Sequence, residues 1–259
     1  MSASIEIAQR LLREHKTNDR FRSTEPAIAT LDDAYKVQAE FVELIMRDRS
    51  ASRAGYKIGL TSTRMQVMCG IDQPIAGVIL ADSIHQTRSS LRLSNFGHLG
   101  VEVEIAVRLG QDLDPRDGPF DMAKVRRAVD AVCPAIELID DRHADYGTLD
   151  VKALVADNAW SAGLVVGEFC SAWPDLSFAI GMVSSNNDLV DKGSGGDVLG
   201  HPFNPLVWLA NQVAAQGKGL RAGDLISTGS LVTTRFPPAG GHYRFDVEEL
   251  GSVELTIQR

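Results

Sequence analysis

Residues 101–109 read V-E-V-E-I-A-V-R-L, a stretch in which every odd-numbered residue is apolar. Successive side chains of a β-strand point to opposite faces, so this period of two predicts a strand with one buried face. Glu102 and Glu104 then share the other face, with their Cα atoms about 7 Å apart. Two like charges at this spacing repel unless water or a cation lies between them, and Mg²⁺ or Mn²⁺ prefers carboxylate oxygens. A solvated acidic face on an edge strand is the simpler explanation of this pattern taken alone.

A third carboxylate, Glu137, lies within C-P-A-I-E-L-I-D (133–140), a run otherwise apolar enough to form a buried strand. A carboxylate in that setting must be paired, protonated or bound to a metal. A buried salt bridge to an arginine and a metal site explain Glu137 equally well. Three carboxylates that converge leave coordination positions open for waters and substrate oxygens, as a catalytic Mg²⁺ site requires.

Lys57 lies in G-Y-K-I-G-L (55–60), where apolar residues and glycines surround a lysine that is costly to bury. Burial would lower its pKa towards the range of an acid or base catalyst, and a neighbouring carboxylate would alter that shift. A strand lysine whose ammonium reaches the solvent is the simpler alternative.

The rest of the sequence divides near residue 50. Residues 4–14 and 31–48 place apolar side chains at intervals of three and four, which predicts two amphipathic helices, and Thr30 with Asp33 resembles a capping box at the second. From residue 55, short apolar runs separated by Gly, Pro and Asp indicate strands. Their irregular order predicts an α+β fold, with an N-terminal helical section at 1–50 and a β-rich catalytic domain at 51–259. Further helices are expected at 62–69, 121–132 and 203–215, strands at 56–60, 101–109, 135–139, 162–167, 224–229 and 253–258, and a hairpin at 184–188.

Composition limits the classes of function. The 259 residues carry a formal net charge of -8 with a pI near 5.3, which argues against a nucleic-acid-binding surface. The N-terminus lacks the apolar run of a signal peptide, and no segment is apolar for long enough to cross a bilayer, so a cytoplasmic protein is expected. Three widely spaced cysteines fit buried, reduced thiols. The absence of G-x-S-x-G, P-loop and H-E-x-x-H motifs disfavours nucleotide, nicotinamide and zinc enzymes.

Seven segments of the chain form an ordered series: G-Y-K-I-G-L-T-S-T-R-M-Q (55–66), G-I-D-Q-P-I-A-G-V-I-L (70–80), V-E-V-E-I-A (101–106), P-A-I-E-L-I-D-D-R (134–142), V-A-D-N-A (155–159), W-L-A-N (208–211) and A-G-D-L-I-S-T-G-S-L (222–231). Together they resemble the 2-keto-4-pentenoate hydratase / 4-oxalocrotonate decarboxylase branch of the fumarylacetoacetate hydrolase superfamily. The resemblance covers nearly the whole chain beyond the N-terminal helices, and the combination is far more specific than any one segment.

The resemblance implies a mixed β-sandwich roll of the fumarylacetoacetate hydrolase type behind the helical section. It also implies that Glu102, Glu104 and Glu137 ligate Mg²⁺ or Mn²⁺ and that Lys57 is the active-site lysine. The implied activity is that of a Mg²⁺-dependent hydro-lyase that converts 2-hydroxy-2,4-dienoates into 4-hydroxy-2-oxo acids in meta-cleavage degradation of aromatic compounds. Decarboxylation of 2-oxo-3-hexenedioate, C–C bond hydrolysis and a non-catalytic partner subunit are the alternatives. Family members are oligomeric, so a homo-oligomer and association with a partner hydratase or decarboxylase are expected.

Four further polar residues are candidates for the lining of a substrate pocket: Ser62, Asp157, Thr228 and Ser230. A helix cap or a turn hydroxyl explains each of them equally well. The chain departs from the family pattern at Trp160, where small residues are common, and at Gly241-His242, where Gly-Asp is frequent. Both departures bear on the substrate and neither touches the metal ligands.

Overall fold

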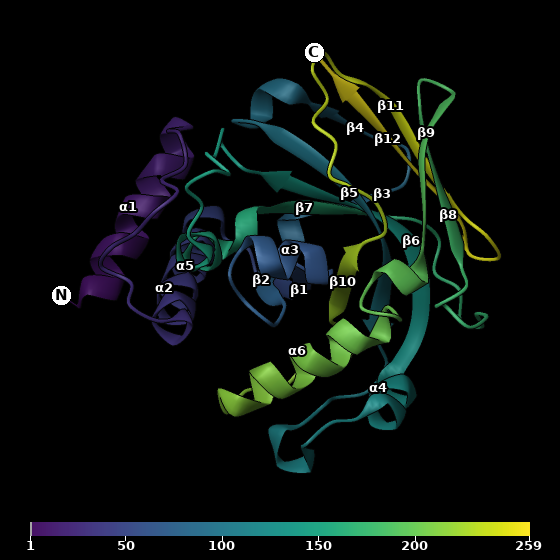
Figure 1. Ribbon diagram of the computed structural model, residues 1–259, viewed down its shortest axis with the longest axis horizontal. Coiled ribbons are helices and arrows are strands. Elements are labelled where there is room, and N and C mark those ends of the chain that lie inside the picture. Colours follow the sequence, from purple (N-terminus) through teal and green to yellow (C-terminus); the bar gives the residue numbers. More distant parts are fainter. Residues whose placement is uncertain (1) are drawn as a thin grey trace.

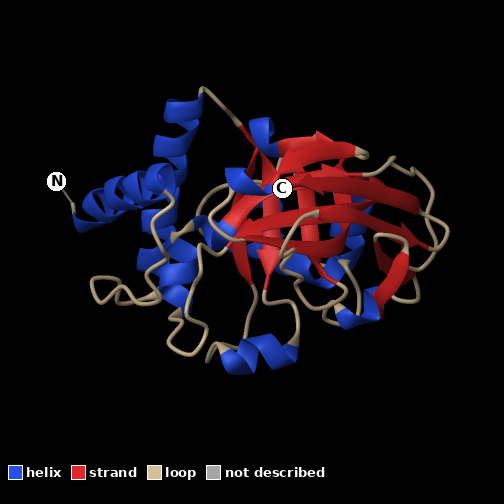
Figure 2. Cartoon of the chain, turned by 90° about the horizontal axis from the view of Figure 1, so that it is seen from above, coloured by secondary structure: helices blue, strands red, loops and turns tan. Residues whose placement is uncertain are grey.

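Two β-sheets form the centre of the protein, with the first helices of the chain at one side of them (Figure 1). The computed structural model describes residues 2–259 and has the predicted α+β class. Figure 2 shows the N-terminal helices grouped beside the strands, not interleaved with them. The division of the chain near residue 50 therefore separates a helical section from a β-rich one.

The helical section consists of α1 (Ala3–Thr17) and α2 (Leu31–Arg49). Their apolar sides meet each other and the short helix α5 (Val151–Ala156), and Leu11, Phe41 and Val155 belong to one buried cluster. The predicted cap of α2 is present, because Thr30 Oγ1 accepts a hydrogen bond from the Asp33 amide at 3.1 Å and donates one to Asp33 Oδ2 at 2.8 Å. A satisfied amide at the first turn fixes where α2 begins.

Replacing Thr30 with alanine should lower the free energy of unfolding by about 1 kcal/mol, because the Asp33 amide loses its partner. Urea denaturation followed by circular dichroism measures the change. Ser2→Ala is the matched control, since Ser2 occupies the same position before α1 but makes no side-chain capping bond. Equal effects of the two substitutions would contradict the role of the Thr30 cap.

Both sheets mix parallel and antiparallel pairs. The larger sheet has the strand order β2-β1-β10-β5-β6-β7-β3 and the smaller one the order β4-β12-β11-β8-β9. The pairs β1–β10, β3–β7 and β4–β12 are parallel. The strands are β1 (Arg53–Gly59), β2 (Ile75–Leu80), β3 (Ile84–Gln86), β4 (Ser89–Arg92), β5 (Leu99–Leu109), β6 (Val129–Asp140), β7 (Ser161–Val166), β8 (Ile180–Ser185), β9 (Asp188–Ser194), β10 (Leu225–Ser230), β11 (Gly241–Val247) and β12 (Gly251–Gln258).

The odd-numbered residues of β5 face the smaller sheet. Val103 is buried in the same hydrophobic cluster as Phe245 of β11 and Leu255 of β12. Since side chains alternate along a strand, Glu102 and Glu104 point to the opposite face of the larger sheet. The hydrophobic core thus fixes the direction of the two carboxylates.

Two of the three other predicted helices are present in the structure as expected. Helices α3 (Thr63–Met68) and α6 (Phe203–Ala215) lie where they were predicted, whereas α5 was not predicted. Among residues 2–259, no helix is both long enough and apolar enough to cross a membrane. Five short 3-10 helices complete the chain: η1 (Ala81–Ser83), η2 (Leu93–Asn95), η3 (Pro115–Asp117), η4 (Asn158–Trp160) and η5 (Gly195–Asp197).

The predicted helix at 121–132 is wrong in its second half. Helix α4 (Met122–Ala128) ends early, and β6 begins at Val129 and pairs with β5 from there on. Asp130 points outward and pairs with Arg108 of β5, while its neighbours are buried. The ladder to β5 therefore decides the conformation of this segment. The predicted hairpin at 184–188 is confirmed, with its turn between β8 and β9.

Candidate metal centre

Three glutamates converge on the face of the larger sheet that points away from the smaller one. The register of β5 and β6 places Glu102 directly opposite Glu137, and Glu104 lies two residues further along β5. One carboxylate oxygen from each of the three lies within 4.8 Å of those of the other two. The sequence predicted this set, and pairing of β5 with β6 is what brings it together.

The carboxylates differ in burial and in their partners. Glu104 is fully buried, and its Oε2 accepts hydrogen bonds from Ser227 Oγ at 2.5 Å and from the Gly229 amide at 2.7 Å. Glu102 is half-buried and accepts a hydrogen bond from the hydroxyl of Thr234. Within the part of the chain that the structure describes, Glu104 Oε1 and Glu137 Oε2 have no hydrogen-bond donor.

Lys57 on β1 completes the cluster, and its side chain reaches Glu137 past the intervening strands β10 and β5. Its Nζ lies 2.7 Å from Oε1 of Glu137, and the side chain is only 5% exposed, so the ammonium does not reach the solvent. The partner of Glu137 is thus a lysine and not one of the arginines. Gly77 on β2 makes room for the lysine stem, because a Cβ there would lie 3.1 Å from Lys57 Cγ and 2.5 Å from the carbonyl oxygen of Asn158.

Burial and mutual repulsion control the ionisation of these groups. Burial raises the pKa of Glu104 well above its usual value, and the charges of Glu137 and Glu102 add to the rise. Burial also raises the pKa of Glu137, although the charge of Lys57 opposes the rise. For Lys57, burial favours the neutral amine, but the charges of Glu137 and Glu102 outweigh it and raise the pKa. Three acids therefore share one buried cation.

The residues present fit a divalent cation. Buried carboxylates without a donor are costly, and oxygens without a partner at Glu104 and Glu137 face the same small space. All three ligand groups are hard oxygen donors, the set that Mg²⁺ and Mn²⁺ prefer. A doubly charged ion at this point would supply the positive charge that Lys57 alone does not.

The four expected lining residues do not join the cluster. Ser62 caps α3 and accepts a hydrogen bond from the Met65 amide at 3.4 Å. Thr228 is fully buried and donates to the carbonyl of Ile105 at 2.6 Å. Ser230 donates to the carbonyl of Val103 at 3.3 Å. These hydroxyls serve the backbone of β5 and α3 in the structure, so any contact with a substrate remains a prediction.

Asp157 has a structural role that was not expected. Its Oδ1 lies 2.6 Å from Nε2 of His15 on α1, and its Oδ2 accepts a hydrogen bond from Arg142 at 2.6 Å. Asp157 and Arg142 are buried, so this ion-pair network ties the helical section to the end of β6. Both oxygens have partners within the protein, and contact of Asp157 with a substrate remains a prediction.

The two departures from the family pattern lie in different parts of the fold. Trp160 is buried and its ring packs edge-on against Phe21 and Tyr146. Its indole therefore points inward and fills space between the helical section and the loop after β6. Gly241 and His242 open β11 in the smaller sheet, where they pair with β12.

Sequence reasoning missed the groups that hold the glutamates. Ser227 and Gly229 stand in the D-L-I-S-T-G strand that was predicted, and alternation puts them on one face, opposite Thr228. That signal was present for Ser227, and the register also pairs Ser230 directly with Glu104, with a β-bulge between Ser227 and Ser230. Thr234 lies beyond any predicted strand, and its contact with Glu102 depends on backbone pairing between Arg235 and Val101.

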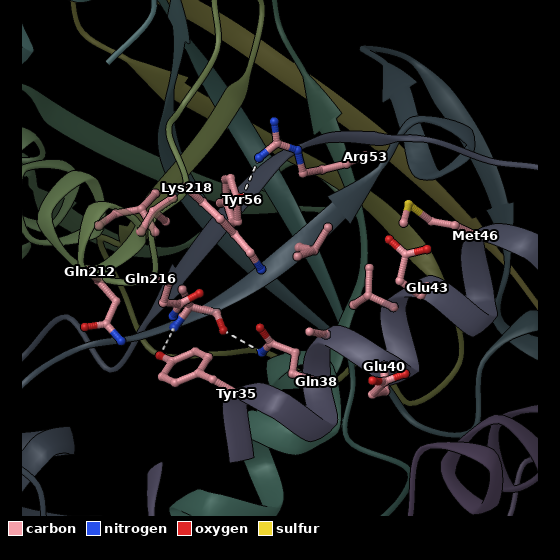
Figure 3. A pocket seen from close by; sticks show the side chains of 16 residues that line it. Tyr35, Gln38, Glu40, Glu43, Met46, Arg53, Tyr56, Gln212, Gln216 and Lys218 are labelled. Atoms are coloured by element: carbon pink, nitrogen blue, oxygen red, sulfur yellow. Dashed lines mark hydrogen bonds between the residues drawn. The ribbon is translucent and has the colours of Figure 1, made fainter. Parts of the chain in front are cut away.

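A separate cavity of about 440 Å³ lies between α2, the first strands and α6 (Figure 3). Tyr56 lines it, whereas its neighbour Lys57 points through the other face of β1 into the acidic cluster. Figure 3 shows Tyr35 and Gln38 on α2 hydrogen-bonded to the backbone of Ala76, while Arg53 and Tyr56 are bonded to each other. The cavity and the acidic cluster are therefore on different sides of the larger sheet.

Comparisons with known proteins point to one group of enzymes. The family model described as fumarylacetoacetate (FAA) hydrolase C-terminal matches residues 61–258. The chain is 36% identical to the 2-keto-4-pentenoate hydratase of Paraburkholderia xenovorans, over 88% of this chain and 84% of that one. It is 35% identical to the 2-oxo-hept-4-ene-1,7-dioate hydratase of Escherichia coli, over 97% of this chain and 96% of that one.

A solved structure supports the same grouping. The 4-oxalocrotonate decarboxylase of Pseudomonas putida, complexed with magnesium and adipate, matches with a TM-score of 0.91 and 28% identity, over 98% of this chain and 97% of that chain. The predicted fold type is thereby confirmed for the helical section and both sheets.

Proposed function

This chain belongs to the fumarylacetoacetate hydrolase family, and from that membership and the acidic cluster we propose that it is a metal-dependent hydratase of 2-hydroxy-2,4-dienoates. The relatives described above are two hydratases and a decarboxylase, all of them lyases. The observation that carries the proposal is the convergence of Glu102, Glu104 and Glu137 beside Lys57 on one sheet face. The product of the reaction is a 4-hydroxy-2-oxo acid.

The cofactor is a divalent metal, for which we propose Mg²⁺, with Mn²⁺ as the alternative hard ion. The P. putida decarboxylase contains magnesium in its solved structure. When bound, such an ion acts as a Lewis acid on the carbonyl of a 2-oxo acid and stabilises the negative charge of a dienolate. Glu102, Glu104 and Glu137 hold the ion, and Ser227 and Gly229 keep Glu104 in place.

Lys57 handles the protons of the substrate or holds its anion. A 2-hydroxy-2,4-dienoate first ketonises to a 2-oxo-3-enoate, which requires a proton at C5. Water then adds to the conjugated system, with its hydroxyl at C4 and a proton at C3. Lys57 is buried and lies 2.7 Å from Glu137, so its ammonium is held at a fixed point beside the carboxylates. A positioned ammonium of this kind supplies general acid catalysis or electrostatic binding.

Decarboxylation of 2-oxo-3-hexenedioate is the second candidate, favoured by the TM-score of 0.91 with the P. putida decarboxylase. In that reaction the carboxylate attached to C5 leaves as CO2, and its electron pair remains in a 2-hydroxydienoate that takes up one proton. A non-catalytic partner subunit is a weaker candidate, because it has no need of three buried or half-buried acids and a lysine.

We further propose that the protein forms a homo-oligomer and associates with a partner decarboxylase or hydratase, as its family suggests. Light scattering measures the mass of the homo-oligomer.

The assay that decides between the activities uses two substrates. Purified protein with Mg²⁺ is mixed with 2-hydroxypenta-2,4-dienoate and, separately, with 2-oxo-3-hexenedioate, and both reactions are followed by ultraviolet absorbance and CO2 release. A hydratase consumes the first without releasing CO2, whereas a decarboxylase releases CO2 from the second. If the folded protein binds metal and consumes neither, both proposals fail.

A further inference from the structure

A histidine and an aspartate extend the acidic face beyond Glu102. His98 directly precedes β5 and Asp141 directly follows β6, so they lie next to Leu99 and Asp140, the last pair of the ladder. His98 Nδ1 lies 2.6 Å from Asp141 Oδ1. By alternation along β5, His98 is on the same face as Glu102 and Glu104, about 13 Å from Glu102 along the strand.

The imidazole of His98 is held on three sides. Its ring is stacked between those of His143, at 4.4 Å, and Phe236, at 4.5 Å. Asp141 is buried, and its carboxylate also accepts hydrogen bonds from the His143 amide at 2.9 Å and from the hydroxyl of Tyr146 at 2.9 Å. Three contacts therefore fix the orientation of the ring and leave it a single free edge.

That free edge is Nε2, for which the structure gives no partner among residues 2–259. The His98 side chain is 35% exposed while Asp141 is only 1% exposed, so the edge is accessible and its support is not. In the imidazolium form both ring nitrogens donate, Nδ1 to Asp141 and Nε2 outward. Asp141 thus occupies one ring nitrogen, and the other is left for a ligand.

Gly100, Thr234 and Phe236 lie between His98 and the acidic cluster. A Cβ on Gly100 would lie 3.0 Å from Phe236 Cε1, 3.0 Å from Thr234 Cγ2 and 2.7 Å from Ile139 Cγ1. Thr234 in turn contacts Glu102, and Phe236 stacks on His98. These residues form a mainly apolar strip between the proposed site for a 2-oxo acid and the oriented imidazole of His98.

We propose that His98, oriented by Asp141, binds a second carboxylate at the far end of the substrate, so that the preferred substrates are dicarboxylic. The inference rests on the proposed function, which places the 2-oxo acid end at the glutamates. A five-carbon monoacid is too short to approach His98, because its chain spans only about 5 Å with bonds of about 1.5 Å. A diacid of six or seven carbons extends further along the strip and ends in the group that an imidazolium binds most strongly.

The test compares two ligands of equal length, 2-oxoadipate and 2-oxohexanoate, which differ only in the far carboxylate. Calorimetry with the Mg²⁺-loaded protein should show that 2-oxoadipate binds at least tenfold more tightly, as a charge-assisted hydrogen bond provides. His98→Leu should remove this preference without weakening 2-oxohexanoate binding. His98→Gln, which keeps a neutral donor, should retain part of it, and Asp141→Asn should reduce it.

His242→Leu is the matched control, because His242 lies on β11 in the smaller sheet. It should leave the preference for 2-oxoadipate unchanged. If the wild-type protein binds the two acids equally, or if His98→Leu weakens both by the same factor, the inference is wrong while the proposed function stands. If neither acid binds in a Mg²⁺-dependent manner, the proposed function fails and the inference fails with it.

Discussion

Replacing Lys57 with methionine should abolish most turnover and leave metal binding intact. Methionine keeps the length and the apolar stem of the side chain but removes the ammonium that lies 2.7 Å from Glu137. Loss of a positioned proton donor lowers kcat by roughly a thousandfold. The carboxylates lose a competing cation, so Mg²⁺ affinity should stay the same or rise. Steady-state kinetics with 2-hydroxypenta-2,4-dienoate and calorimetry with Mg²⁺ measure the two effects separately.

Which of the two constants, kcat or KM, changes in the Lys57→Met enzyme shows the role of Lys57. A fall in kcat alone indicates proton transfer, whereas a rise in KM with kcat preserved indicates that the ammonium holds the substrate anion. Lys192→Met is the matched control, because Lys192 is exposed on β9 in the smaller sheet. A Lys57→Met enzyme as active as this control would remove Lys57 from the mechanism.

Local patterns predicted the parts of the site that depend on one strand. Alternation in V-E-V-E-I-A-V-R-L put Glu102 and Glu104 on one face, and the structure has them there. The apolar run around Glu137 predicted a buried strand and a carboxylate that needs a partner. The period of two is a local property, so these conclusions required no knowledge of which strands pair.

Contacts between distant segments could not be predicted in the same way. Asp157 is followed by small and polar residues that suggest a turn or a pocket, yet its partner His15 lies 142 positions earlier. Thr234 reaches Glu102 across 132 positions, through a strand extension that has no periodic signal. Nothing local distinguishes a hydroxyl that supports a glutamate from one that bonds to a backbone carbonyl. The pairing of whole strands and helices decides these contacts, and the sequence alone left them open.

The helical boundary at 129 has a related cause. The segment V-D-A-V-C (129–133) permits a helix by composition, but all of its residues except Asp130 are buried once β6 pairs with β5. A ladder along most of both strands stabilises this segment more than one extra turn of helix α4 would. Tertiary pairing therefore outweighs a weak local preference.

Glu104→Gln should have opposite effects on metal binding and on the metal-free fold. The amide has the shape of the carboxylate, and its oxygen still accepts the hydrogen bonds from Ser227 and Gly229. It removes one negative charge from the ligand set, so Mg²⁺ affinity should fall by at least about 100-fold, because changes to outer-shell partners alone cost 10- to 100-fold. Without metal, the same change relieves repulsion among three crowded carboxylates and should raise the melting temperature.

Calorimetry measures the affinity, and thermal unfolding in the presence of a chelator measures the stability. Glu168→Gln is the matched control, since Glu168 is exposed and lies just after β7. The two readouts separate a metal ligand from a structural acid. A structural carboxylate that holds Ser227 and Gly229 would lose stability on substitution and leave Mg²⁺ affinity unchanged, and that result would exclude Glu104 from the metal site. Weaker metal binding together with a more stable metal-free protein is expected only of a metal ligand. The charge of Glu104 then destabilises the metal-free protein and serves to bind the cation.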